Sequence, residues 1–426
     1  MADLLEDLRN FIDTSPTSWH AALQVSNRLA LQEFIPLDEK QKWELEPGQK
    51  YFVLRGGSIC AFCLPKSLPT RALILAAHTD SPALKIKPHP EIVKNNMIQL
   101  GVEVYGGPLL SSWLNRDLGI AGRIVITDTQ NQIQEKLIDI DEAPLFIPQL
   151  AIHLDREVNE KGLILNKQDH LAPIAALSGE QASSMGYLEK LLRRHLSFHD
   201  LISFDLFLTP LEKFRFVGEN NEMIASYRLD NLASVHAATA AISTPKEMDP
   251  ALLQMAVFWD HEEIGSKTAE GASSPFLCDL LKRIAYCLKI DEEALLMLKN
   301  DSLCVSIDMG HALNPNYVKK HDPNHQPLLG KGIVVKYNAD HKYASDAFSS
   351  ARIIHTCKQH NLNYQSYVNR SDLPSGSTVG PIVAQGLGIP TVDIGIAQLS
   401  MHSAREVIAS LDYLNLYQLL FELLKT

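Results

Sequence analysis

Residues 255–266 read Met-Ala-Val-Phe-Trp-Asp-His-Glu-Glu-Ile-Gly-Ser, so an apolar run leads directly into a cluster of acidic and imidazole side chains. A short apolar run bounded by polar residues is typical of a buried β-strand. The same arrangement, a strand-like run followed by a His or an Asp, occurs at three more places along the chain. These places are residues 72–77 before His78, 302–307 before Asp308 and 391–396 before His402.

Stretches with the apolar spacing of α-helices lie between and after these strand-like runs. They are residues 231–242, 275–288, 344–360 and 403–424. Alternating strands and helices are typical of an α/β domain built around a central sheet. In an open α/β sheet, sites form beyond the carboxyl ends of the strands. We therefore expect the polar residues that follow the four runs to meet at one edge of the sheet.

The middle of the chain, from about residue 88 to 222, has a different pattern. Short segments of alternating polar and apolar residues, such as 97–105 and 121–127, are typical of β-hairpins. The sequence therefore predicts an α/β domain with a central mixed sheet, formed by residues 1–87 and 223–426. A β-rich insertion at 88–222 is expected to interrupt this domain.

The composition argues against several classes of protein. Of the 426 residues, 46% are hydrophobic and 21% are charged, as in ordinary soluble globular proteins. The formal net charge of −11 argues against a broad nucleic-acid surface, so no nucleic-acid partner is expected. No apolar run approaches the ~20 residues of a membrane span, and the acidic start lacks the features of a signal peptide. With six cysteines in so long a chain, we expect a cytoplasmic protein without a disulfide framework or a membrane partner.

The side chains that follow the strand-like runs suit a divalent metal ion. Imidazole and carboxylate ligands bind zinc, manganese or cobalt, and no cysteine stands beside them. Asp230, where a helix is expected to begin, could reach the same edge. Any one of these residues alone is more often a cap or a surface group. Their combination favours a metal centre, in which two divalent ions would be balanced by Asp230, Glu263, Asp308 and a hydroxide.

Two further residues have a chemical reason to stand beside such a centre. Glu262 precedes Glu263, and a carboxylate next to a metal-bound water is suited to act as a general base. Asp80 follows His78 by two residues, so its side chain could accept a hydrogen bond from the second imidazole nitrogen. Such a bond would orient the ring of His78.

Five separated motifs stand in an order that covers nearly the whole chain. They are His78-Thr-Asp-Ser-Pro, Arg228-Leu-Asp-Asn-Leu, Trp259-Asp-His-Glu-Glu-Ile-Gly-Ser, Ser306-Ile-Asp-Met-Gly-His-Ala and Ser400-Met-His-Ser-Ala-Arg-Glu. Together they resemble the aspartyl aminopeptidase family of dinuclear zinc exopeptidases. The resemblance implies a zinc-exopeptidase-type α/β catalytic domain that is interrupted by a β-rich dimerisation domain. It also implies an enzyme that releases N-terminal Asp or Glu from peptides.

The resemblance implies a role for each ligand-type residue. Asp230 would bridge two zinc ions, with cobalt or manganese as alternatives. His78 and Asp308 would complete one ion's ligands, and Glu263 and His402 would complete the other's.

The mechanism that the resemblance implies is attack on the scissile carbonyl by a hydroxide shared between the two ions. Glu262 would take the proton of the water and pass it to the leaving amine. An acidic substrate side chain would need a cationic partner, and the resemblance points to Lys336 and His311. Backbone N–H groups at Gly376 could hold the oxyanion. Without the resemblance, Lys336 would be an ordinary exposed lysine on a strand and Gly376 part of a tight turn.

The resemblance also implies a homo-oligomer. The β-rich insertion would form dimers, and the dimers would assemble into a tetrahedral dodecamer that encloses the active sites. His153 would reach the active site of the partner subunit. The sequence alone favours a surface histidine on a strand at this position.

Two departures from the family pattern concern the substrate pocket rather than the ligands. Asn314 stands where relatives often have His, and Ser375-Gly-Ser377 stands where they often have Cys-Gly-Thr. The first lies close to His311, so it bears on substrate preference. Three other functions stay open on the sequence: the same chemistry with a neutral or broad preference, a noncatalytic oligomeric shell, and a deacylase of small amides.

Overall fold

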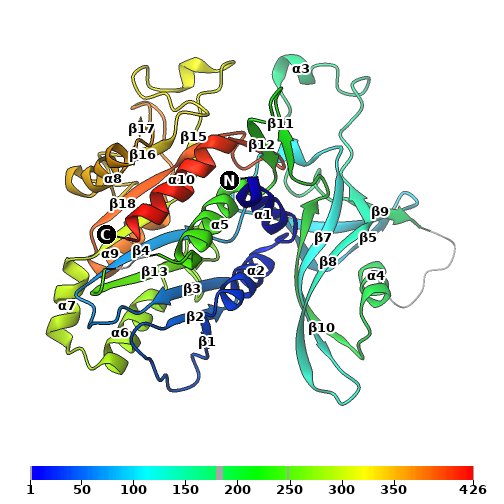
Figure 1. The fold of residues 1–426 in the computed structure, drawn as a ribbon. Helices are drawn as coiled ribbons and strands as arrows, with labels where there is room; N and C mark the ends of the chain where they lie inside the picture. The colour runs from blue at the N-terminus through cyan, green and yellow to red at the C-terminus, as the bar shows by residue number, and fades with distance from the viewer. Residues whose placement is uncertain (1, 179–185, 247–248, 426) are drawn as a thin grey trace. The chain divides into compact units, whose positions relative to one another are not determined.

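The computed structural model describes three stretches of the chain, residues 2–178, 186–246 and 249–425. They divide into two compact units (Figure 1). The first unit consists of the chain up to residue 80, residues 214–401 and the chain from residue 406 onward; the second consists of residues 81–213 and 402–405. The insertion expected at 88–222 thus overlaps the second unit, whose two limits both lie a few residues earlier in the chain.

In the first unit, thirteen strands among the described residues form one mixed sheet. The four strand-like runs of the sequence are its central strands, in the order β13, β4, β14, β18, and these strands are parallel. Their mostly apolar sequences are typical of parallel strands that are buried on both faces. The strands of the sheet are β1 (Ile35–Leu37), β2 (Lys50–Arg55), β3 (Ser58–Cys63), β4 (Arg71–His78), β11 (Arg215–Val217), β12 (Met223–Ser226), β13 (Leu252–Trp259), β14 (Leu303–Ile307), β15 (Gly310–His311), β16 (Ile333–Tyr337), β17 (Tyr364–Val368), β18 (Thr391–Leu399) and β19 (Glu406–Ala409).

Helices cover both faces of this sheet, and the strand side chains alternate between the two apolar cores. In β4, Leu73 and Leu75 point into one core, whereas Ile74 and Ala76 point into the other. The first core is covered by α1 (Ala2–Asp13), α2 (Ser18–Leu31), α5 (Leu229–Ser243), α8 (Ala347–Gln359) and α10 (Ser410–Leu423), and Figure 1 shows α5 and α10 side by side. The second core is covered by α6 (Phe276–Leu288), α7 (Glu292–Asn300) and α9 (Val379–Leu387). No described helix combines the length and apolar composition needed to cross a bilayer.

The expected helices at 231–242, 275–288 and 344–360 are confirmed as α5, α6 and α8. The expectation of a single helix over 403–424 is wrong at its start. Residues 406–409 form β19, which pairs with β12 and β18, and α10 begins only at Ser410. Since Val407 and Ile408 are β-branched and fit a pleated sheet between two neighbours, pairing outweighs the apolar spacing that suggested a helix.

The second unit contains a closed barrel of six strands among its described residues, in the order β10, β5, β6, β9, β8, β7. The hairpins expected at 97–105 and 121–127 are confirmed as parts of this barrel. Its interior is filled by buried side chains such as Leu84, Leu100 and Leu206, so the barrel is a packed core. The elements of this unit are β5 (Ala83–Lys94), β6 (Met97–Tyr105), η1 (Leu110–Trp113), β7 (Asp117–Thr127), β8 (Ile133–Phe146), α3 (Val158–Lys161), β9 (Ile174–Leu177), α4 (Tyr187–His195) and β10 (Leu201–Pro210).

Candidate metal centre

Three of the predicted ligand segments begin at the same edge of the central sheet. His78 is the last residue of β4, and in the parallel pairing it stands opposite Trp259, the last residue of β13. Asp308 directly follows β14, the other neighbour of β4. The carboxyl ends of β13, β4 and β14 therefore lie together, as the order of strands and polar residues in the sequence predicts.

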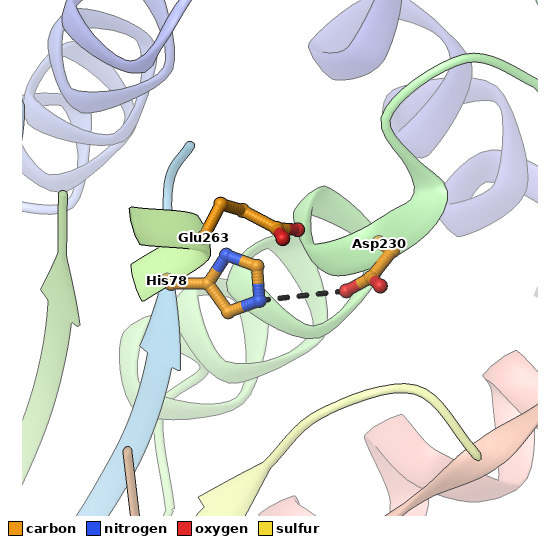
Figure 2. Close-up of side chains that lie close together, drawn as sticks. All are labelled: His78, Asp230 and Glu263. Carbon is orange, nitrogen blue, oxygen red and sulfur yellow. Dashed lines mark ion pairs between the residues drawn. The ribbon is translucent and has the colours of Figure 1, made fainter. Parts of the chain in front are cut away.

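The cluster is centred on the imidazole of His78. Its Nε2 atom lies 3.4 Å from Oδ1 of Asp230 and 3.6 Å from Oδ1 of Asp308. His78, Asp230 and Glu263 each offer one ligand atom, and these atoms all lie within 4.8 Å of one another. Figure 2 shows the three side chains pointing toward one another from separate segments of the chain. The structure thus brings together four of the five predicted ligands.

Asp230 reaches the cluster because the chain does not enter α5 as a regular helix. Arg228 has a left-handed φ of 65°, and Asp230 and Asn231 have non-helical backbone angles, with a cis peptide bond between them. The backbone N–H of Asp230 donates to Oε2 of Glu406 at 3.0 Å, and the side-chain Nδ2 of Asn231 donates to the carbonyl of Ile307 at 2.8 Å. These bonds tie the entry of α5 to β19 and to the end of β14, and so fix the position of the Asp230 carboxylate.

Asp80 connects the end of β4 to the segment that carries the two glutamates. Its carboxylate accepts hydrogen bonds from the backbone N–H groups of Glu262 (3.0 Å) and Glu263 (3.1 Å) in η2 (Glu262–Ile264). Nδ1 of His78 lies 3.1 Å from the carbonyl oxygen of Asp80 and 3.5 Å from its Oδ1. The nearest acceptor for this nitrogen is thus the main-chain carbonyl of Asp80, whereas the sequence predicts its carboxylate.

Lys336 lies beside the cluster and differs from the exposed lysine that the sequence alone suggested. Its side chain is 2% exposed, and its Nζ lies 3.6 Å from Oδ2 of Asp308 and 5.4 Å from the ring centre of Tyr343. Burial opposes the charge, but Asp308 and other nearby acidic groups outweigh it and raise the pKa of Lys336. His311 is exposed on β15, and its ring stands edge-on to that of Tyr367 at 6.0 Å.

The remaining predicted site residues are His402, His153 and Gly376. His402 belongs to the second unit, where its Nδ1 lies 3.2 Å from the carbonyl of Gly107. His153 also belongs to the second unit, and it is an exposed turn residue rather than part of a strand. Gly376 lies in an exposed stretch before α9, and no described neighbour lies within 4 Å of the place where a Cβ would stand.

The sequence profile of the aminopeptidase I zinc metalloprotease family (M18) matches residues 11–423. This chain belongs to the M18 family. A probable M18 family aminopeptidase 2 of Streptomyces avermitilis is 41% identical over 413 residues, which cover 96% of this chain and 94% of the relative. A probable aspartyl aminopeptidase of Ricinus communis is 36% identical over 447 residues, which cover 95% and 91%. The solved mApe1 dodecamer of S. cerevisiae has a TM-score of 0.85 and 26% identity, covering 99% of this chain and 96% of that chain.

M18 membership makes this protein a zinc metalloaminopeptidase, a hydrolase that acts on peptides. The cluster fits the metal, since zinc in proteins is bound by imidazole nitrogen and carboxylate oxygen. The ligand atoms of His78, Asp230 and Glu263 converge from three segments, and Asp308 stands beside them. A cation there would also offset the repulsion among the crowded carboxylates.

The titratable side chains of this cluster shift one another's pKa values. The pKa of Glu262 is raised to about 8, first by burial and then by the carboxylates of Asp308, Asp80 and Asp230, although the charge of His78 opposes the rise. Burial lowers the pKa of His78, but hydrogen bonds to Asp230, Asp308 and Asp80 outweigh it and raise this pKa well above its ordinary value. The site therefore retains protons near neutral pH until a cation displaces them.

Glu406, which holds the backbone of Asp230 in this M18 chain, is not among the residues that the sequence predicts. Its side chain is buried and stands in β19 beside Val407 and Ile408. A charged residue inside an apolar strand segment is a signal of a buried partner. Because the apolar spacing of residues 403–424 predicts a helix, it gives no sign that this segment pairs with β12 and so reaches Asp230.

Proposed function

We propose that this M18 enzyme releases acidic N-terminal residues, Asp or Glu, from peptides with the help of two zinc ions. The ligands would be His78, Asp230 and Asp308 on one side and Asp230, Glu263 and His402 on the other. The observation that carries the proposal is the convergence of His78, Asp230 and Glu263 within 4.8 Å. His402 enters on its motif, three residues after the end of β18.

Zinc, when bound, would act as a Lewis acid on the scissile carbonyl and lower the pKa of the attacking water. Glu262 is the chain's own proton carrier in this proposal. Without metal, its pKa is raised to about 8. A bound cation would favour the carboxylate form, which could take a proton from water and return it to the leaving amine. Asp80 would keep Glu262 and Glu263 in place through the two backbone hydrogen bonds that its carboxylate accepts.

Lys336 would bind the acidic side chain of the substrate. Its buried ammonium group lies 3.6 Å from Asp308, so it would put a positive charge next to the proposed reacting atoms. Such a charge favours a carboxylate over an apolar side chain of the same size. Lys336 has a second plausible task, which is to balance the charge of Asp308, so the kinetics must separate the two.

The first experiment measures hydrolysis of Asp-, Glu-, Leu- and Ala-p-nitroanilide by the purified protein, with chelator and after metal is returned. We expect release from Asp and Glu that chelator abolishes and zinc, cobalt or manganese restores. Release mainly from Leu or Ala would retain the chemistry and overturn the acidic preference. No release with any metal would contradict a peptidase and revive the shell or the deacylase.

The second experiment compares Lys336→Ala on Asp and Leu substrates. A substrate-binding lysine predicts a loss on Asp that exceeds the loss on Leu by at least about tenfold, since a charge-assisted contact is removed. Equal losses would assign Lys336 to the balance of charge at Asp308. Lys331→Ala is the matched control, because this lysine stands just before the same strand and is exposed.

We also propose that the protein is a homo-oligomer, with the second unit forming dimers. The match to the mApe1 dodecamer covers 99% of this chain, which supports the same assembly here. In this assembly His153 would enter the site of the partner subunit. Light scattering gives the mass of the oligomer. A mixed oligomer of His153→Ala and Glu262→Gln subunits tests whether His153 acts in the site of the partner subunit. Activity that mixing partly restores supports a residue acting in trans; no restoration opposes it.

A further inference from the structure

The turn between β2 and β3 contacts both segments that supply the metal centre. Gly56 and Gly57 form this turn, and Ser58 begins β3. On one side, the hydroxyl of Thr79, the residue after His78, donates to the carbonyl of Gly57 at 2.7 Å. The turn is therefore attached directly to the end of β4.

On its other side, the turn holds the segment that contains the two glutamates. The hydroxyl of Ser58 accepts a hydrogen bond from the N–H of Asp260 at 2.8 Å and donates to the carbonyl of Glu270 at 2.7 Å. The N–H of Gly57 donates to Oε2 of Glu270 at 2.9 Å. Asp260 precedes Glu262 and Glu263 in the sequence, and Glu270 follows them. Both ends of the segment 260–270 are therefore bound to the same turn.

The carboxylate of Asp260 occupies the space where a side chain at position 57 would be. A Cβ on Gly57 would overlap Oδ2 of Asp260. This carboxylate cannot easily move away, because it is 1% exposed and accepts hydrogen bonds from the hydroxyl of Ser18 (2.7 Å) and the N–H of His261 (2.8 Å). The close contact thus depends on glycine at position 57.

We infer that the Gly56–Ser58 turn is a positioning element for the metal centre, acting through Asp260 and Glu270 on Glu262 and Glu263. Groups behind the ligands of a metal site set the direction of those ligands, and their loss typically weakens metal binding 10–100-fold. The inference rests on the proposed metal centre.

The contacts of Asp260, His261 and Glu270 argue against a second role for them, the binding of an additional ion. Asp260, His261 and Glu270 offer ligand-type atoms within 4.8 Å of one another, so they could hold an additional ion. However, the carboxylates already accept hydrogen bonds from Ser18 and Gly57, and Nδ1 of His261 lies 2.9 Å from the hydroxyl of Thr268. These contacts favour a structural network that orients the neighbouring glutamates.

The decisive comparison is between Gly57→Ala and Gly386→Ala in the full-length protein. Neither glycine has a left-handed φ, and a Cβ at Gly386 meets no described neighbour within 4 Å. Zinc affinity is measured by competition with a chromogenic chelator, and folding by circular dichroism and thermal unfolding. We expect Gly57→Ala to bind zinc at least about tenfold more weakly and to have a lower kcat. Gly386→Ala should match the wild type in zinc affinity and kcat.

A second pair of variants covers the case in which Gly57→Ala does not fold. Glu270→Ala removes the acceptor of the Gly57 N–H, whereas Glu270→Gln retains an acceptor oxygen at the same place. We expect weaker zinc binding in Glu270→Ala and recovery in Glu270→Gln. A lower thermal midpoint with unchanged zinc affinity in the folded protein would overturn the inference. It would also be overturned if Glu270→Gln bound one zinc ion fewer per chain, because Glu270 would then be a ligand itself.

Glu263→Ala separates this inference from the proposed function. This change removes a proposed ligand, so unchanged zinc binding in Glu263→Ala would refute the proposed centre itself. Zinc lost by Glu263→Ala but retained by Gly57→Ala and Glu270→Ala would leave the centre in place and overturn only the role of the turn.

Discussion

Asp80 shows how much a single side chain can organise in this protein. Its carboxylate binds the N–H groups of Glu262 and Glu263, and its carbonyl lies 3.1 Å from Nδ1 of His78. One residue therefore sets the relative position of a proposed ligand, a second ligand and the proposed base. The sequence indicated that Asp80 belongs beside His78, but the bonds to the glutamates come from a segment about 180 residues away.

Glu262 is the residue whose replacement best separates chemistry from metal binding. Glu262→Gln keeps the shape of the side chain but cannot carry a proton, so we expect kcat to fall by roughly 100-fold or more. Zinc content and the backbone hydrogen bond to Asp80 should be retained. Kinetics on Asp-p-nitroanilide and metal analysis of the same sample check this. Loss of zinc together with activity would instead make Glu262 a ligand.

The protonation of Glu262 and His78 also predicts how stability depends on pH in chelated protein. Both groups have raised pKa values, to about 8 for Glu262, so the folded protein binds more protons than the unfolded chain between pH 6.5 and 8. The free energy of unfolding must then fall as pH rises through this window. We expect the thermal midpoint to drop by about 2 °C or more.

Two comparisons show whether the drop comes from these groups. Zinc should reduce this drop in the thermal midpoint. Bound metal displaces the protons of the cluster at pH 6.5 as well as at pH 8, so little is left to titrate between them. Glu262→Gln should also reduce it, since one of the two titrating groups is removed. A chelated protein whose midpoint is constant or rises from pH 6.5 to 8 would contradict the raised pKa values.

At the scale of elements, the sequence predicts where the strands end. It does not predict the residues that hydrogen-bond to those strand ends and hold them in place. Short apolar runs followed by His78, Asp260 and Asp308 placed three segments at one sheet edge, and the structure confirms this placement. The β2–β3 turn and Glu406 carry no such pattern, because their contacts depend on which segments the fold brings together. Periodicity reports burial within one element, whereas these contacts join residues that are far apart in sequence.

Helix α9 offers a paired test of close packing at the element scale. A Cβ on Gly380 would overlap the carboxylate of Asp393, which is buried and accepts hydrogen bonds from Thr378 (2.5 Å) and the N–H of Ala344 (2.6 Å). We expect Gly380→Ala to lower the free energy of unfolding by about 1–3 kcal/mol. Gly386→Ala in the same helix should leave it unchanged or raise it by up to about 1 kcal/mol.

Urea unfolding of the two α9 variants gives this difference directly. Because both changes add one methyl group to one helix, helix propensity alone would move them in the same direction. Equal stabilisation of both variants would show that Asp393 shifts at little cost. Equal destabilisation would point to a cause other than the overlap with Asp393.

At the scale of the whole molecule, the change in pattern near residue 88 correctly indicated a second, β-rich part, although the units divide at 80 and 213. The limits differ because β5 starts at Ala83, inside the segment 1–87 that the sequence assigned to the first domain. Short strands that follow one another without a break leave no compositional signal at a boundary. The return of residues 402–405 to the second unit could not be read from the sequence, since four residues show no periodicity.

The proposed assembly makes a prediction for the surface of the second unit. Leu150, Ile152 and Leu154 flank His153 and are 58%, 45% and 75% exposed in the single chain. Clustered exposed apolar side chains of this kind mark interaction sites. If this segment docks on the partner subunit, Leu154→Glu should shift the protein to a smaller oligomer, because a charge would be buried at the contact. Ile133→Glu, at a residue 73% exposed in the same unit, is the control. Light scattering reads the mass of each variant; a full-size Leu154→Glu oligomer, or equal disruption by both changes, would place the contact elsewhere.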